Sequence, residues 1–179
     1  VDLVWTDRPA LSCEPLWELE PKFAGFTRAE KLEKVREKMA ELGADVFVIP
    51  ALDEIAWLLN LRGGDVLYTP VFLSYLLLER GKATLCVQKE AVSAEIEAHL
   101  AADGVKLAPY NDIYALVAAL PQGTRVLLDG ERANYRITQS VGAGVETLDR
   151  PSPIQLMKAM KHPVEQENER IAHIRDGVA

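Results

Sequence analysis

The chain has 179 residues, of which 49% are hydrophobic, and its 20 lysines and arginines against 27 aspartates and glutamates give a formal net charge of −7. This acidic balance argues against nucleic acid or an anionic membrane as a main partner, because both select basic patches. Cys13 and Cys86 lie far apart and no Asn-x-Ser/Thr sequon occurs, so we expect a reducing, cytoplasmic environment. The longest apolar stretch, residues 71–78, is far shorter than the roughly 20 residues of a membrane helix, so we expect no membrane span.

The first 22 residues contain Pro9, Pro15 and Pro21, a spacing that interrupts any helix before it completes two turns. We therefore expect an extended lead-in over residues 1–22. The chain begins at Val1 rather than at a methionine and stops inside a charge-rich, helix-like pattern. We expect it to be a piece of a longer polypeptide.

Beyond the lead-in, the hydrophobic pattern alternates between helical and strand periodicity. Thr27 and Glu30 form a capping-box pattern at the start of the first helix, and Gly43 ends that helix. Helices are predicted at 27–42, 52–60, 89–103, 111–120, 135–141 and 152–160, and strands at 44–50, 71–79, 83–88, 105–108, 125–129 and 145–148. The short connection 80–82 contains a glycine and predicts an antiparallel hairpin. This order predicts a three-layer α/β/α domain with a mixed sheet.

The residues that could carry chemistry form no complete site. The three histidines, His99, His162 and His173, show no metal-binding spacing, and only His99 has a carboxylate one turn away, Glu95. We expect His99 to be a helix-flank side chain beside that carboxylate. The glycines at 63–64 and 142–144 lack the spacing of a phosphate loop and are expected to serve turns. The residues alone predict an acidic α/β domain with no catalytic residue and no metal site.

Three stretches nevertheless resemble a known family. Residues 51–65 read ALDEIAWLLNLRGGD and are followed by PVF at 70–72 and SY at 74–75; residues 1–9 read VDLVWTDRP; residues 161–177 read KHPVEQENERIAHIRDG. The first stretch resembles a characteristic segment of the three-domain Xaa-Pro aminopeptidases, also called aminopeptidase P. The second is similar to the junction between their first and second domains, and the third to the entry helix of their pita-bread catalytic domain. The entry helix departs from the family pattern at Gln166, Asn168 and Glu169.

The resemblance implies a division of the chain. Residues 1–22 would be a linker from a preceding domain, 23–160 a non-catalytic domain like the amino-terminal domain of creatinase and prolidase, with a ribonuclease H-like motif, and 161–179 the first helix of the catalytic domain. It also implies a parent enzyme that uses two divalent metal ions, usually manganese, to cleave the bond before a proline. All the metal ligands would lie beyond Ala179. The implied partners are the catalytic domain, a second subunit, and peptides with proline at the second position.

Residues 60–65 admit two interpretations. Arg62 could face the catalytic cleft or the partner subunit and position a substrate carboxylate or backbone, which its planar fork of donors suits. Alternatively, Asn60 and Arg62 bond neighbouring carbonyls and Asp65, and so fix a turn that the two following glycines permit. We favour the second interpretation, and the candidate substrate-proximal or interface residues are Asn60, Arg62 and Asp65.

The most economical hypothesis is an accessory domain of a metal-dependent Xaa-Pro aminopeptidase that contributes subunit contacts and restricts access to the active site. A second hypothesis is a stand-alone binding or regulatory module that uses the same fold without peptidase activity. A third keeps the wider family but makes the chain the amino-terminal part of a prolidase- or creatinase-like hydrolase. The motif around Trp57 to Asp65 favours the first over the third, by resemblance.

Overall fold

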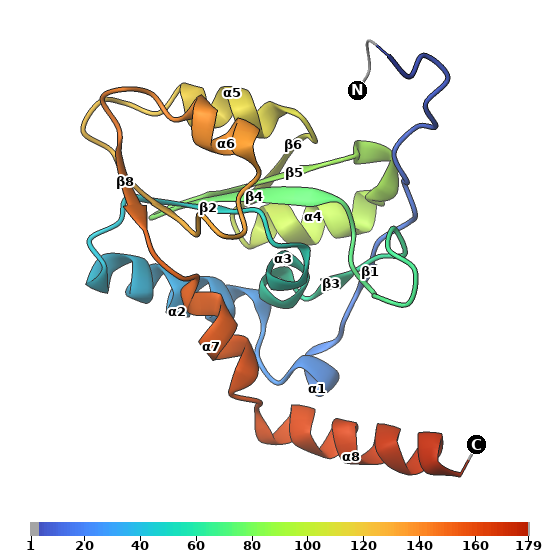
Figure 1. Cartoon of the computed structure of the whole chain (residues 1–179). Coiled ribbons are helices and arrows are strands. Elements are labelled where there is room, and N and C mark those ends of the chain that lie inside the picture. Colours follow the sequence, from blue (N-terminus) through green and yellow to red (C-terminus); the bar gives the residue numbers. More distant parts are fainter. Residues whose placement is uncertain (1–3, 179) are drawn as a thin grey trace.

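The computed structural model describes residues 4–178 and is built around one mixed β-sheet (Figure 1). Within that range the sheet has six strands in the spatial order β6-β5-β4-β2-β7-β8. The strands are β2 (Val46–Ile49), β4 (Ser74–Glu79), β5 (Ala83–Val87), β6 (Val105–Pro109), β7 (Arg125–Leu128) and β8 (Glu146–Asp149). Strand β4 is antiparallel to both of its neighbours, whereas β2–β7, β5–β6 and β7–β8 are parallel pairs. The predicted α/β fold with a mixed sheet is confirmed.

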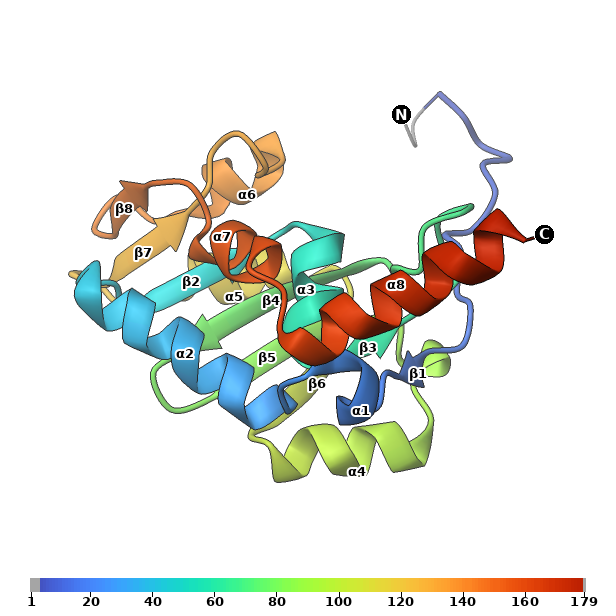
Figure 2. The same ribbon diagram turned by 90° about the horizontal axis from the view of Figure 1, so that it is seen from below.

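Helices cover both faces of this sheet. On one face lie α2 (Arg28–Glu41), α3 (Leu52–Leu59), α4 (Ala94–Ala102) and α7 (Pro153–Ala159), which are in front of the sheet in Figure 2. On the other face lie α5 (Asp112–Ala118) and α6 (Tyr135–Ser140). Strand β2 has four buried residues in a row, as expected for a central strand with two packed faces, whereas the edge strand β8 has no fully buried residue. The three-layer arrangement follows from these two cores.

The lead-in is more structured than its prolines predict. It contains a short strand, β1 (Trp17–Glu18), and a single helical turn, α1 (Pro21–Ala24). Strand β1 pairs antiparallel with β3 (Leu61–Arg62), where the sequence predicts only a loop. Strands of two residues are too short to leave a periodic signature. This pairing joins the start of the chain to the turn after α3.

Two predicted elements have different limits in the structure. The strand expected from residue 71 begins at Ser74, because Val71 and the residues beside it belong to the preceding loop. The helix expected over 89–103 is divided into a 3₁₀ turn, η1 (Lys89–Ala91), and α4, whose N-cap Ser93 accepts a hydrogen bond from the Ile96 backbone N–H. A serine at this position starts a helix, so the helical periodicity before it is misleading.

The last described helix, α8 (Pro163–Gly177), has no buried residue and lies across the outside of the molecule (Figures 1 and 2). Its N-cap is His162, whose ring accepts from the Val164 backbone N–H while Glu165 accepts from the His162 N–H. The Asn168 side chain donates to the Lys22 carbonyl at 3.2 Å, so α8 is fastened to α1. Among the described helices, none is long and apolar enough to cross a membrane.

Candidate functional site

Residues 60–65, named here the motif turn, follow directly from the C-terminus of α3. Asn60 ends that helix in the left-handed conformation, with φ of 52°, which asparagine adopts more readily than other non-glycine residues. Its side chain is buried and donates from Nδ2 to the Phe26 carbonyl at 2.8 Å. Its own carbonyl accepts from the Leu19 N–H at 2.8 Å. Asn60 therefore connects α3 to the lead-in and to the segment before α2.

A buried lysine completes the Asn60 contacts. Lys31 of α2 is only 1% exposed, and its Nζ donates to Asn60 Oδ1 at 2.6 Å and to the Trp57 carbonyl at 2.9 Å. The same ammonium lies 4.3 Å from the centre of the Trp57 ring. Burial lowers the pKa of Lys31 to about 8, while the negative charge of Glu165 acts in the opposite direction. A cation thus closes the carbonyl end of α3, where the helix dipole favours positive charge.

Arg62 is half-buried, and one of its nitrogens fastens the motif turn to the helix before it. Nη1 donates to the carbonyls of Ala56 and Leu61 at 2.8 and 2.9 Å. Within residues 4–178, neither Nε nor Nη2 of Arg62 has a hydrogen-bond partner, so part of the fork is free to bind another group. Burial lowers the pKa of Arg62, and the charge of Glu165 in α8 opposes this effect. Arg62 and Glu165, in the first turn of α8, line the same cavity.

Asp65 has partners other than the one proposed from sequence. Its Oδ1 accepts from the Glu14 backbone N–H at 3.0 Å and its Oδ2 from the Leu73 N–H at 2.8 Å, and neither oxygen bonds to Arg62. The two carboxylate oxygens of Asp65 thus bind the main chain at Glu14 and at Leu73, which are 51 and 8 residues away in the sequence. The carbonyl contacts expected of Asn60 and Arg62 are present, but the expected pairing of Arg62 with Asp65 is wrong.

The glycines of the motif turn do not serve the turn in the way predicted. Neither Gly63 nor Gly64 is among the glycines with positive φ, so left-handed backbone is not the reason for them. A Cβ at Gly63 would lie 2.7 Å from the Cβ of Phe72, a fully buried residue, whereas a Cβ at Gly64 would lie at an ordinary 3.4 Å from Glu14. Gly63 is therefore required by close packing and Gly64 is not.

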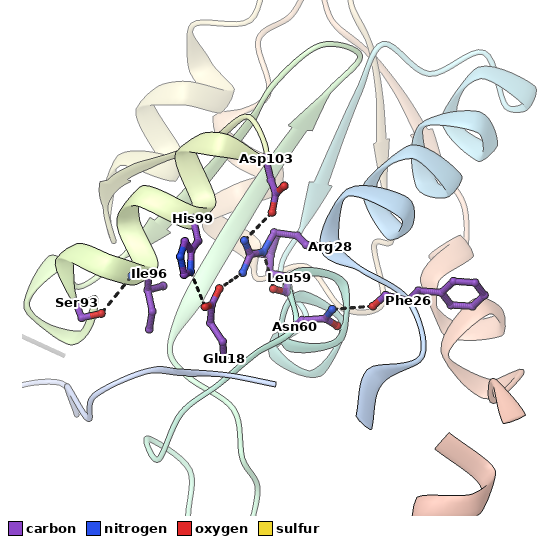
Figure 3. Close-up of polar contacts among 9 residues, drawn as sticks. All are labelled: Glu18, Phe26, Arg28, Leu59, Asn60, Ser93, Ile96, His99 and Asp103. Atoms are coloured by element: carbon purple, nitrogen blue, oxygen red, sulfur yellow. Dashed lines mark hydrogen bonds and ion pairs between the residues drawn. The ribbon is translucent and has the colours of Figure 1, made fainter. Parts of the chain in front are cut away.

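A second polar network holds the lead-in beside Asn60 (Figure 3). Arg28 of α2 is buried and donates from Nε to the Leu59 carbonyl, from Nη1 to Asp103 Oδ2 at 2.8 Å and from Nη2 to Glu18 Oε1 at 2.5 Å. The other oxygen of Glu18 lies 2.8 Å from His99 Nδ1. The carboxylate beside His99 is thus Glu18 of β1, and the sequence expectation of Glu95 is wrong. These four residues, Glu18, Arg28, His99 and Asp103, are named here the Arg28 clasp.

The charges of the Arg28 clasp compensate one another. Partial burial acts to raise the pKa of Glu18, but the hydrogen bonds from His99 and Arg28 outweigh it, so the pKa lies below its usual value. An arginine can bond two carboxylates and a carbonyl at once because its five N–H donors are held in one plane. The clasp joins β1, α2, α4 and the end of α3.

The first turn of α3 is bonded to the segment that forms α7. Glu54 is buried and accepts from the Ser152 hydroxyl at 2.6 Å, and Lys158 forms an ion pair with Asp53. Burial raises the pKa of Glu54, and the hydrogen bond from Ser152 opposes that rise. Ser152 is also the N-cap of α7. The acidic pair at 53–54 therefore attaches α7 to the domain.

A cavity of about 440 Å³ lies between the motif turn, α7 and α8. It is lined by Asp53, Ala56, Trp57, Arg62, Thr69, Pro70, Val71, Gln155, Lys158, Ala159, Lys161 and Glu165. Two of its cations already have acidic partners, since Lys158 pairs with Asp53 and Lys161 with Glu169. The third cation of this wall, Arg62, bonds to main-chain carbonyls instead.

The structure offers no metal centre in the part that it describes. Within residues 4–178, no group of three or more His, Cys, Asp or Glu side chains is placed to hold a metal ion. A dinuclear metal site therefore has no fitting set of ligands among these residues.

The sequence did not reveal Arg28 and Lys31 as part of this site. A signal was present, because residues 28, 31, 32, 35 and 39 are the buried positions of α2 and form one face of that helix. Two basic residues within such a face indicate buried cations that need partners.

Comparison with known proteins defines the class. The sequence profile of the family described as "Creatinase/Prolidase N-terminal domain" matches residues 7–165, so the chain belongs to this family. Over its full length it is 36% identical to a "Probable Xaa-Pro aminopeptidase P" of Sordaria macrospora and 39% identical to the protein of that name in Neosartorya fischeri. The chain spans 31% and 29% of the lengths of those relatives. It is thus similar to one part of Xaa-Pro aminopeptidase P.

Solved structures give the same relationship. The X-prolyl aminopeptidase of Caenorhabditis elegans, described as a cytosolic enzyme with a di-nuclear active site, aligns with a TM-score of 0.87 and 31% identity. The alignment covers 98% of this chain and 29% of that enzyme. A prolidase from Pyrococcus horikoshii aligns with a TM-score of 0.51 and 18% identity, which shows a shared fold alone.

Proposed function

We propose that this chain is a non-catalytic domain of a metal-dependent Xaa-Pro aminopeptidase, an enzyme that releases the N-terminal residue preceding a proline. In this role it contributes contacts to the catalytic domain and to a second subunit, and it limits access to the active site. The observation that carries the proposal is the alignment of nearly the whole chain with less than one third of an enzyme described as having a di-nuclear active site. The same relative supports a cytoplasmic location.

The hydrogen bonds of the motif turn favour a structural, non-catalytic role for its residues. Asn60, Arg62 and Asp65 all bond to main-chain groups of neighbouring segments, which is the arrangement of a fixed structural junction. Arg62 lines the cavity beside α8, the helix that we propose begins the catalytic domain. Arg62 is therefore proposed as the residue of this domain that lies nearest to the catalytic cleft or to the partner subunit.

The divalent metal ions of the proposed enzyme, manganese by family resemblance, would bind outside this chain. Metal content tests this directly. The complete polypeptide, loaded with manganese and exchanged into metal-free buffer, should retain about two ions per chain by native mass spectrometry. Residues 1–179 treated in the same way should retain none. A manganese ion held at full occupancy by residues 1–179 would contradict the proposed division of labour.

A further inference from the structure

The loop between β3 and β4 presents an apolar tip to solvent. Leu67 and Tyr68 are 77% and 96% exposed, and Val66 before them is partly exposed as well. These three residues are named here the 66–68 tip. Scattered exposed apolar residues are ordinary, but three in succession at the end of a loop are typical of a contact surface.

Hydrogen bonds fasten the loop that carries the tip. Asp65 fastens the start of the loop through both carboxylate oxygens, to Glu14 and to Leu73. Within the loop, the Thr69 N–H donates to the Val66 carbonyl at 3.1 Å. Tyr68 has φ of 62°, a left-handed conformation that is strained for an aromatic residue and persists only where the surrounding structure imposes it. A preformed apolar tip loses little conformational entropy when it is covered.

The position of the loop indicates what covers it. Its base, residues 69–71, lines the same cavity as Lys161, which precedes α8, and Glu165 in the first turn of α8. The loop and the C-terminal half of α8 lie at the same end of the molecule, on the right in Figures 1 and 2. Exposed apolar residues recur at helical spacing at Ile171 and Ile174 of α8 and at its C-cap, Val178. The 66–68 tip and the exposed apolar residues of α8 thus lie at the same end of the molecule.

We propose that the 66–68 tip is a docking element for the catalytic domain of the same polypeptide, which covers the tip and the apolar stripe of α8 together. The relatives are about three times as long as this chain, so they contain polypeptide that could occupy this space. This inference rests on the proposed function, since it needs a catalytic domain in the same polypeptide. Asp65 becomes a positioning residue for this contact, which accounts for the use of both its oxygens on main-chain groups.

Oxidative footprinting of side chains tests the inference without measuring catalysis. Labelling of Leu67 and Tyr68 is compared between residues 1–179 and the complete polypeptide, with Tyr135 of α6, 77% exposed on the opposite face of the sheet, as internal control. We expect the labelling of the tip to fall at least about fivefold in the complete polypeptide, as for a desolvated contact residue, and that of Tyr135 to stay constant. Equal labelling of the tip in both proteins would overturn the inference. So would protection that appears in residues 1–179 alone as concentration rises, because the occupant would then be a second copy.

A matched substitution gives a second readout. Tyr68→Gly relieves the left-handed strain while it removes the contact side chain. We expect residues 1–179 to keep or raise their unfolding midpoint with this change, whereas the complete polypeptide should lose protection of Leu67. Unchanged protection of Leu67 in the complete polypeptide would contradict the role of Tyr68. If the tip is protected but the polypeptide cleaves no Xaa-Pro bond, the proposed activity fails, and only the contact between the tip and the rest of the polypeptide stands.

Discussion

The ammonium of Lys31 and the side-chain oxygen of Asn60 lie 2.6 Å apart, and both residues are almost completely buried. This contact joins α2 to the left-handed residue that ends α3, and so sets the direction in which the motif turn leaves the helix. The cost of burying a cation is offset here by two acceptors and an aromatic face. The consequences are measurable.

The first prediction concerns the dependence of stability on pH. Lys31 has a pKa of about 8 in the folded protein and a usual value of 10.5, so between these limits the unfolded chain binds more protons. Its destabilising contribution is fully present below pH 8 and is relieved as pH rises towards 10.5, by an amount of up to about 3 kcal/mol. Urea unfolding of the wild type and of Lys31→Met should therefore diverge with rising pH, in favour of the wild type. Parallel curves from pH 7.5 to 10 would show that Lys31 does not titrate in this range.

The second prediction separates the two glycines of the motif turn. Gly63→Ala places a methyl group against Phe72 and should lower the free energy of unfolding by about 1–3 kcal/mol, as for an overpacked core. Gly64→Ala meets only ordinary contacts and should change it by less than about 0.5 kcal/mol. Equal effects of the two substitutions in a chemical unfolding assay would show that packing at Gly63 is not the deciding factor.

The third prediction concerns the Arg28 clasp. Arg28→Gln leaves two carboxylates and a buried carbonyl without their shared donor, and should cost about 2 kcal/mol. The exposed Arg80, paired with Asp45, is the matched control, and Arg80→Gln should cost less than about 1 kcal/mol. Hydrogen exchange at the Leu16 and Leu19 amides, which bond to residues 91 and 60, should accelerate in the first variant alone. Unchanged exchange there would mean that the clasp does not hold the lead-in.

The fourth prediction tests the functional interpretation of Arg62. In the complete enzyme, Arg62→Ala should lower kcat/KM for an Xaa-Pro peptide at least about tenfold, equivalent to the loss of one charge-assisted hydrogen bond. Folding should remain intact, because the hydrogen bonds of Arg62 to the Ala56 and Leu61 carbonyls are only partly buried, so water can replace the lost donor. Circular dichroism provides the folding control. An unchanged rate with a lower unfolding midpoint would assign Arg62 a purely structural role.

Much of the fold could be predicted because each long element has a local signature. The capping box of Thr27 and Glu30 is present at the start of α2. Strands β4 and β5 form the predicted hairpin, joined by a short connection that contains a glycine. The central strand β2 was recognisable from its unbroken apolar run. These features depend on neighbours in sequence, so the sequence carries them directly.

The candidate site was harder to predict because its contacts join distant segments. Asp65 bonds to Glu14 across 51 residues and His99 to Glu18 across 81, and no spacing rule connects such pairs. The pairing of β1 with β3 involves two residues on each strand, too few for a pattern. Phe72 leaves no room for a side chain at Gly63, and this close approach is visible only in the folded structure.

The central claim is that this domain supports catalysis performed elsewhere in a longer aminopeptidase. The most direct test is hydrolysis of an Xaa-Pro-Xaa peptide in the presence of manganese, measured for residues 1–179 and for the complete polypeptide. We predict release of the N-terminal residue by the complete polypeptide alone. Hydrolysis by purified residues 1–179 would contradict the claim by revealing an active site within them, and silence of both proteins would contradict the assignment to an active Xaa-Pro aminopeptidase.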